Sequence, residues 1–141
     1  GCDIVTDTQM AKAGINKTIL ASLGGEVHCF MSDPDVAQEA RSRGVTRAFV
    51  SMEKAAALEK PCILAIGNAP TALLSLEQLM EEGKAAPALI IGVPVGFVNV
   101  EASKERIIEK ARAPYIVARG RKGGSNVAAA ICNALLYQIR R

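Results

Sequence analysis

Residues 120–125, Gly-Arg-Lys-Gly-Gly-Ser, combine residue types that bind anions. Glycines allow backbone amides to turn toward a ligand, and Arg121 and Lys122 add two full positive charges. The segment follows the apolar run 115–118 and precedes an alanine-rich helical pattern. This order of strand, Gly-rich loop and helix places a helix N-terminus, with its partial positive charge, behind the loop. The pattern therefore predicts a site for negatively charged groups.

Two further loops have the same organisation. Gly67-Asn68-Ala69-Pro70-Thr71 and Gly92-Val93-Pro94-Val95-Gly96-Phe97 each follow a strand-like apolar run. Three such loops favour a substrate that carries several negative charges. These loop residues can also have a purely structural role, because Thr71 can be an ordinary helix cap. The glycines of the 92–97 loop can equally serve close packing at a subunit contact.

Five other polar residues could contribute to such a site or could be structural. Arg47 follows Thr46 at the start of a predicted strand, where its guanidinium can bind a carboxylate through two hydrogen bonds or remain a surface charge. Ser103 and Lys104 can be a helix cap and a solvated cation. Asp7 follows the first predicted strand and is expected to cap the next helix. His28, the chain's one histidine, lies within a predicted strand and is expected to serve packing.

Common catalytic and metal-binding patterns are missing from the sequence. There is no Ser-His-Asp signature, and Lys122 precedes the paired glycines instead of following them as in a nucleotide P-loop. A nucleotide-binding α/β domain remains an alternative, supported only by the presence of Gly-rich loops after predicted strands. The four cysteines are isolated and read as small core residues in a reducing cytoplasm. We expect neither a metal site nor a cofactor.

The composition bounds the protein class. The 141 residues form one domain, and a chain that is 50% hydrophobic but only 4% aromatic must build its core from Ala, Val, Ile and Leu. The net charge of +3 does not indicate nucleic-acid binding. The longest apolar runs fall short of the roughly 20 residues that cross a bilayer, and no signal peptide is visible, so we expect a cytoplasmic protein with no membrane partner.

The elements that must position these residues alternate along the chain. The pattern predicts strands at 2–5, 26–30, 46–49, 62–66, 88–93 and 115–118, and helices at 8–23, 34–43, 52–58, 70–82, 104–111 and 126–139. Strands separated by helices predict a doubly wound, three-layer αβα fold with a mostly parallel sheet. All three Gly-rich loops then lie at the carboxyl ends of strands, where such folds bind ligands.

The loops together resemble those of the precorrin-8X methylmutase family, which includes cobalt-precorrin-8 methylmutases. The similar segments are Asp7-Thr8-x-Met10, Gly14-Ile15, Thr46-Arg47, Ile66 to Leu73, Pro87-Ala88, Gly92 to Val98, Ser103-Lys104 and Gly120 to Ser125, in family order. The resemblance implies an α/β homodimer and an isomerase of cobalamin biosynthesis. Its reaction moves a methyl group from C11 to C12 of precorrin-8X or cobalt-precorrin-8, giving hydrogenobyrinate or cobyrinate, without a cofactor.

The resemblance also implies which residues contact the tetrapyrrole, whose acetate and propionate groups suit anion-accepting loops. The substrate-binding candidates are Arg47, Asn68, Thr71, Ser103, Lys104, Arg121, Lys122, Gly123, Gly124 and Ser125. We expect Arg47 and Arg121 to clamp carboxylates and the amides of Gly123 and Gly124 to cradle another.

Two departures from the family pattern bear on catalysis. The family's general-acid histidine belongs to a segment ahead of residue 1, so the catalytic residue is unassigned and the domain is expected to be N-terminally incomplete. The family glutamate before Ser-Lys is replaced by Ala102, with Glu101 one residue earlier. A non-catalytic paralogue that binds a corrinoid is therefore the alternative function.

Overall fold

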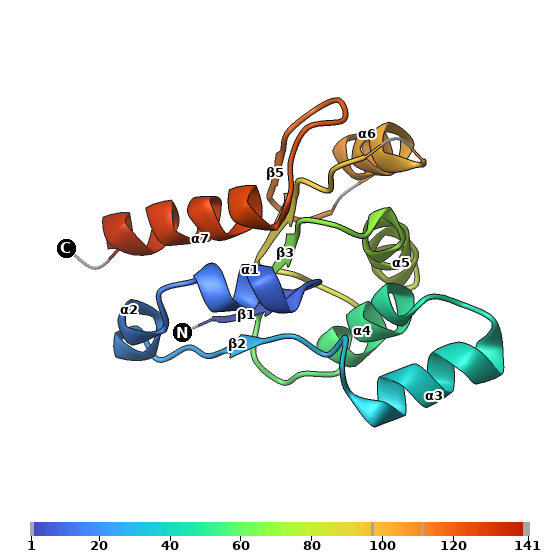
Figure 1. Cartoon of the computed structure of the whole chain (residues 1–141), viewed down its shortest axis with the longest axis horizontal. Coiled ribbons are helices and arrows are strands. Elements are labelled where there is room, and N and C mark those ends of the chain that lie inside the picture. Colours follow the sequence, from blue (N-terminus) through green and yellow to red (C-terminus); the bar gives the residue numbers. More distant parts are fainter. Residues whose placement is uncertain (1, 97, 111, 140–141) are drawn as a thin grey trace.

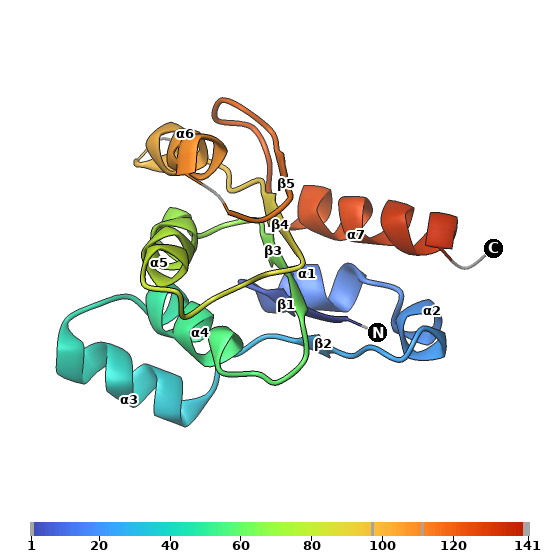
Figure 2. The ribbon, with the colours of Figure 1, turned by 180° about the vertical axis from the view of Figure 1, so that it is seen from behind.

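A parallel five-stranded sheet forms the centre of the molecule in the computed structural model, which describes residues 2–96, 98–110 and 112–139 (Figures 1 and 2). The strands lie in the order β2-β1-β3-β4-β5, and every neighbouring pair is parallel. Their bounds are β1 Asp3–Thr6, β2 Val27–His28, β3 Cys62–Ile66, β4 Leu89–Gly92 and β5 Tyr115–Val117. The helices are α1 Gln9–Gly14, α2 Lys17–Ser22, α3 Pro34–Arg43, α4 Arg47–Ala56, α5 Pro70–Glu81, α6 Val100–Lys110 and α7 Ser125–Ile139.

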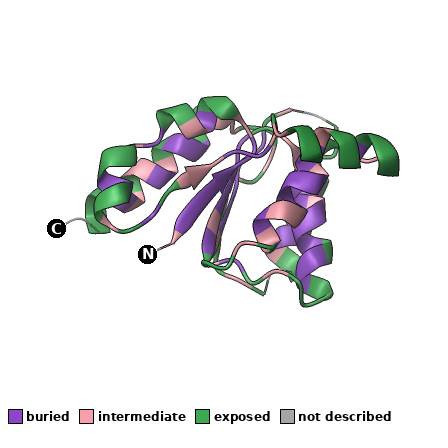
Figure 3. Ribbon diagram, turned by 90° about the horizontal axis from the view of Figure 1, so that it is seen from below, coloured by how far each residue is buried: buried purple, intermediate pink, exposed green. Residues whose placement is uncertain are grey.

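Helices cover both faces of the sheet, which confirms the predicted three-layer αβα architecture. Successive strand side chains point to opposite faces, so Ile4 packs with the cluster of α1, α2 and α7, while Val5 packs with the cluster beneath α3 to α6. Figure 3 shows the buried strands between the two helical layers. The core is aliphatic, as the composition predicts, and Cys29, Cys62 and Cys132 are buried within it as free thiols.

The predicted helix 8–23 is wrong, because the chain forms two short helices there. The helical segment is interrupted at Asn16, whose side chain accepts a hydrogen bond from the Ile19 amide and caps α2. Asn133 of α7 accepts from the Asn16 amide at 2.8 Å and donates to the Gly14 carbonyl at 2.9 Å. A partner 117 residues away thus stabilises the break.

The predicted strand 46–49 is also wrong, because this segment is the first turn of α4. Thr46 is the N-cap, and its hydroxyl accepts from the Phe49 amide at 3.1 Å. The β-branched and aromatic residues favour a strand locally, but Ala48, Met52 and Ala55 lie on one buried helical face. Tertiary packing therefore overrides propensity. Strand 26–30 shortens to the two residues of β2.

Candidate functional site

The loops that follow β1, β3, β4 and β5 converge on the carboxyl edge of the sheet. Strand order 2-1-3-4-5 reverses direction between β1 and β3, and this switch point is where doubly wound folds open a ligand crevice. The site is therefore built around the β1 loop (residues 7–8) and the β3 loop (residues 67–69). The loops after β4 and β5 border the β3 loop.

Asp7 occupies the switch point and is not the helix cap we expected. Thr8 caps α1, whereas the Asp7 carboxylate accepts hydrogen bonds from the amides of Gly67 at 2.8 Å, Asn68 at 2.8 Å and Ala69 at 2.6 Å. Burial raises the pKa of Asp7, and these three hydrogen bonds act against that rise. The three backbone amides of this Gly-rich loop are therefore satisfied by the protein itself.

The β4 and β5 loops are packed directly against each other. A Cβ on Gly123 would lie 2.0 Å from the Val93 carbonyl oxygen, so only glycine fits there. The Gly124 amide donates to the Val93 carbonyl at 2.8 Å, and the Gly96 amide donates to the Arg121 carbonyl. The expectation that the Gly124 amide cradles a carboxylate is wrong in this arrangement. Phe97, part of the same predicted loop, lies outside the described residues.

Ser125 joins the β5 loop to the loops after β1 and β3. Its hydroxyl lies 2.7 Å from the Thr8 hydroxyl, and a Cβ on Gly67 would clash with the backbone of Gly124 and Ser125. Gly67 is therefore needed for close approach of two loops. The paired hydroxyls stand at the start of α7, where the helix dipole favours negative charge.

Lys104 is buried and does not have the solvated position we considered. Its side chain is fully enclosed (0% exposed), and Nζ donates to the carbonyls of Gly120 at 2.8 Å and Lys122 at 2.9 Å. Burial lowers the pKa of Lys104, while the charge of Glu101 acts in the opposite direction. Ser103 is equally buried, and its hydroxyl donates to the Val100 carbonyl within α6. Neither side chain faces the open edge.

Three predicted cations are exposed along this edge. Arg47 is the first residue of α4, and its guanidinium makes no ion pair or hydrogen bond with the described residues. Lys122 is exposed in the β5 loop. Arg121 lies beside it, with Nε 2.9 Å from Glu101 Oε1 in a pair whose side chains are 61% and 55% exposed. Exposed pairs of this kind contribute only about 0–1 kcal/mol to stability.

Asn68 and Thr71 flank the beginning of α5. Asn68 is exposed, and its backbone amide is one of the three that bind Asp7. Thr71 is not the cap of α5, which is Ala69. The Thr71 hydroxyl accepts instead from the Thr46 hydroxyl at 2.9 Å, which brings the starts of α4 and α5, and with them Arg47, to the same edge.

His28 lies away from this edge. Its Nε2 atom is 2.9 Å from Asp3 Oδ2, and its ring stacks on Phe30 with centroids 5.6 Å apart. Asp3 is the first residue of β1 and Asp7 follows the last, so the histidine pairs at the opposite end of that strand. The predicted packing role holds, but the acidic partner was not visible in the sequence because it is 25 residues away.

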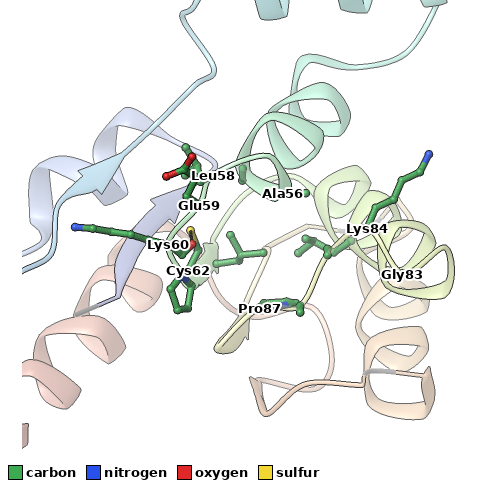
Figure 4. Close-up of a pocket in the computed structure, with 14 residues that line it drawn as sticks. Ala56, Leu58, Glu59, Lys60, Cys62, Gly83, Lys84 and Pro87 are labelled. Atoms are coloured by element: carbon green, nitrogen blue, oxygen red, sulfur yellow. Dashed lines mark hydrogen bonds between the residues drawn. The ribbon is translucent and has the colours of Figure 1, made fainter.

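A cavity of about 380 Å³ opens at the opposite, amino end of the strands, between the ends of α4 and α5 and the start of β3 (Figure 4). None of the predicted site residues lines it. In Figure 4, Lys60 and Lys84 extend away from the centre of the cavity, and the other labelled residues around it include Glu59, Cys62 and Pro87. Its walls do not suit a ligand with many carboxylates, whereas the carboxyl edge does.

The chemistry available at the carboxyl edge is binding and orientation of anionic groups. In the part of the chain that the structure describes, no three His, Cys, Asp or Glu residues gather as a metal site. None of the described helices combines the length and the apolar character that crossing a bilayer requires. Cations, hydroxyls and a helix N-terminus on packed loops together favour a polycarboxylate ligand.

Comparison with known proteins gives one family throughout. The family model for precorrin-8X methylmutase matches residues 1–138. A cobalt-precorrin-8 methylmutase of Salmonella typhimurium is 49% identical over 140 residues, covering 99% of this chain and 64% of that protein. One of Leptospira interrogans is 47% identical over 143 residues, covering 96% and 65%. The chain thus spans less than two thirds of the length of these relatives.

The crystal structure of a precorrin-8x methyl mutase from Thermus thermophilus superposes with a TM-score of 0.84 at 38% identity, covering 97% of this chain and 66% of that one.

Proposed function

Because the chain belongs to the precorrin-8X methylmutase family, we propose that it provides the substrate-binding domain of an isomerase of cobalamin biosynthesis. The reaction moves a methyl group from C11 to C12 of precorrin-8X or cobalt-precorrin-8, and any cobalt belongs to the substrate. The observation that carries this proposal is that three exposed cations lie at the carboxyl edge of the sheet, Arg47 at the start of α4 and Arg121 and Lys122 in the β5 loop.

The packed loops explain how such a site would work. Arg47 and Lys122 bind carboxylates at the tetrapyrrole periphery, and Arg121 does so by exchanging Glu101 for a substrate group. Because the loops are fixed by Asp7 and by one another, little freedom is lost when the ligand binds. A rearrangement within one molecule gains chiefly from orientation and from a correctly placed proton donor.

We further propose that the protein acts as a homodimer whose contact includes the 92–98 loop. Val95 and Val98 support this, because they are 46% and 79% exposed in the monomer. Apolar side chains in a loop beside a ligand site are typical of a surface that a second subunit covers.

A corrinoid-binding protein without catalytic activity is the second candidate, and the position of His28 favours it. The chain's one histidine pairs with Asp3 at the opposite end of β1 from the proposed site. Binding would then persist while the proton transfer that the methyl shift requires would be missing.

The visible spectrum of the substrate during incubation with the purified chain tests both candidates. Conversion of the precorrin-8x spectrum to that of hydrogenobyrinate supports the isomerase. A shifted spectrum that never converts shows binding alone, which fits the binding protein and equally a substrate-binding domain whose proton donor lies elsewhere. A spectrum identical to that of free substrate, at protein concentrations up to the millimolar range, contradicts both.

A further inference from the structure

Lys104 is unusual because its fully buried ammonium donates hydrogen bonds to the β5 loop, which carries the exposed cations Arg121 and Lys122. Taking an unpaired ammonium out of water is costly, so a buried lysine requires strong compensating contacts. The compensation here comes from two backbone carbonyls, those of Gly120 and Lys122. These are the residues on either side of Arg121, so the ammonium binds the loop on both sides of its first cation.

The remaining loop contacts show that the backbone is held from several directions. The Arg121 carbonyl, between the two that Lys104 binds, accepts from the Gly96 amide, and the Gly124 amide donates to Val93. Three successive carbonyls are thereby directed into the protein. Gly120 and Gly124, with φ of +89° and +125°, provide the left-handed turns at the two ends of the loop. Figures 1 and 2 show this loop, between β5 and α7, beside α6, which carries Lys104.

We propose that Lys104 is a positioning residue of the substrate site, whose buried ammonium holds the Gly120–Lys122 backbone so that Arg121 and Lys122 face substrate carboxylates. This inference rests on the proposed function for the identity of the ligand, but its structural part does not. The substrate-contacting role that the sequence indicated for Lys104 is thereby replaced by an indirect one.

The structural part is tested by limited trypsin digestion, because trypsin cleaves after Arg121 and Lys122 only when that backbone can leave its contacts. We expect Lys104→Met to release fragments ending at these two residues at least about tenfold faster than wild type, since it removes two charge-assisted hydrogen bonds. Ser103→Ala is the matched control, because Ser103 is equally buried in α6 but its hydroxyl donates to the Val100 carbonyl of the same helix. Its cleavage rate should stay near that of wild type. Lys104→Gln, which keeps amide donors without charge, provides an intermediate rate and a second test if Lys104→Met does not fold.

The functional part is tested by titration with hydrogenobyrinate in a double-mutant cycle. If Lys104 acts through the loop, Lys122→Ala weakens binding about tenfold in the wild-type background and has little further effect beside Lys104→Met. Additive effects of the two substitutions, or unchanged trypsin cleavage in both Lys104 variants, overturn the inference. Absence of corrinoid binding by the wild-type chain would instead defeat the proposed function, and the digestion would still decide whether Lys104 holds the loop.

Discussion

Asp7 and Lys104 are buried charges that hold loops of the same edge in opposite ways. The Asp7 carboxylate accepts from three amides of the β3 loop, and the Lys104 ammonium donates to two carbonyls of the β5 loop. Locally, the sequence indicated a helix cap and a solvated cation for them. Their partners lie about 60 and 16 residues away, beyond the reach of any local pattern. The absence of a capping side chain at Ala69, ahead of Pro70, is the signal that could have pointed to an acceptor elsewhere.

Substitution of Asp7 should lower the free energy of unfolding. Asp7→Ala leaves three amides without their acceptor, and a buried donor without a partner costs about 1–3 kcal/mol, so we expect a loss of roughly 2–4 kcal/mol. Asp7→Asn keeps one oxygen and should lose less. Urea denaturation measures both, with Asp35→Ala on the exposed side of α3 as the control. A midpoint for Asp7→Ala equal to that of the control would refute this role.

Arg47 is the site residue whose role is most directly testable, because its side chain has no partner among the described residues. Arg47→Ala should weaken hydrogenobyrinate binding by about 1–3 kcal/mol, as expected for the loss of a charged hydrogen-bond partner. Isothermal calorimetry gives the affinity. Arg41→Ala, which removes an equal charge from α3, should change it by less than about 0.5 kcal/mol. Equal affinities for the wild type and Arg47→Ala would remove Arg47 from the site.

At the scale of elements, the two helix starts marked by proline were predicted accurately, whereas α4 and α6 begin five and four residues before the predicted 52 and 104. The Pro34 and Pro70 starts and the Gly44 end of α3 follow from local backbone preferences, and the structure has them at those residues. The break between α1 and α2 depends on Asn133, and the β5 loop depends on its contact with Val93. Such contacts join residues distant in sequence, so periodicity does not reveal them.

The contact between the β4 and β5 loops can be tested at Gly123. An alanine Cβ there would lie 2.0 Å from the Val93 carbonyl oxygen, so the two loops must separate. We expect Gly123→Ala to lower the free energy of unfolding by roughly 2–4 kcal/mol, within the range of severe packing substitutions, and to weaken corrinoid binding. Gly44→Ala is the control, because at φ +67° it meets no atom within 4 Å and should cost only about 1–2 kcal/mol of backbone strain. Equal losses in the two variants would contradict tight packing between the loops.

At the scale of the whole molecule, the fold class, the parallel sheet and the edge that carries the candidate site were predictable from alternating elements and Gly-rich loops. What was not predictable is how the protein uses its own groups at that edge. Arg47, Arg121 and Lys122 remain exposed there, whereas Lys104, Ser103 and the Gly124 amide are engaged internally. Sequence pattern shows which residues can bind anions, but only the packed structure shows which are already satisfied.

The opposite end of the sheet should govern the acid stability of the molecule through Asp3. Burial by itself would raise the pKa of Asp3, but hydrogen bonds from His28 and the Glu26 amide, with the charge of Lys60, hold it below the ordinary value of 3.8. A carboxyl whose folded-state pKa is lowered contributes stability that is fully present above its unfolded pKa and is lost as pH falls through the folded value. The free energy of unfolding should therefore decline as pH falls below 3.8.

Asp3→Asn should reduce the decline of the free energy of unfolding at acid pH. It should also lower that free energy at pH 7 by about 1.5–3 kcal/mol, the range for hydrogen bonds to a charged group. Urea denaturation between pH 2.5 and 7 measures both effects, within the range of ordinary buffers. Asp33→Asn, in a half-buried pair with Lys54, is the control and should keep the slope of the wild type. Asp3 joins β1 to β2 through His28 and Glu26. If the free energy of unfolding declined identically with falling pH in the wild type and in Asp3→Asn, this pairing would not stabilise the edge of the sheet.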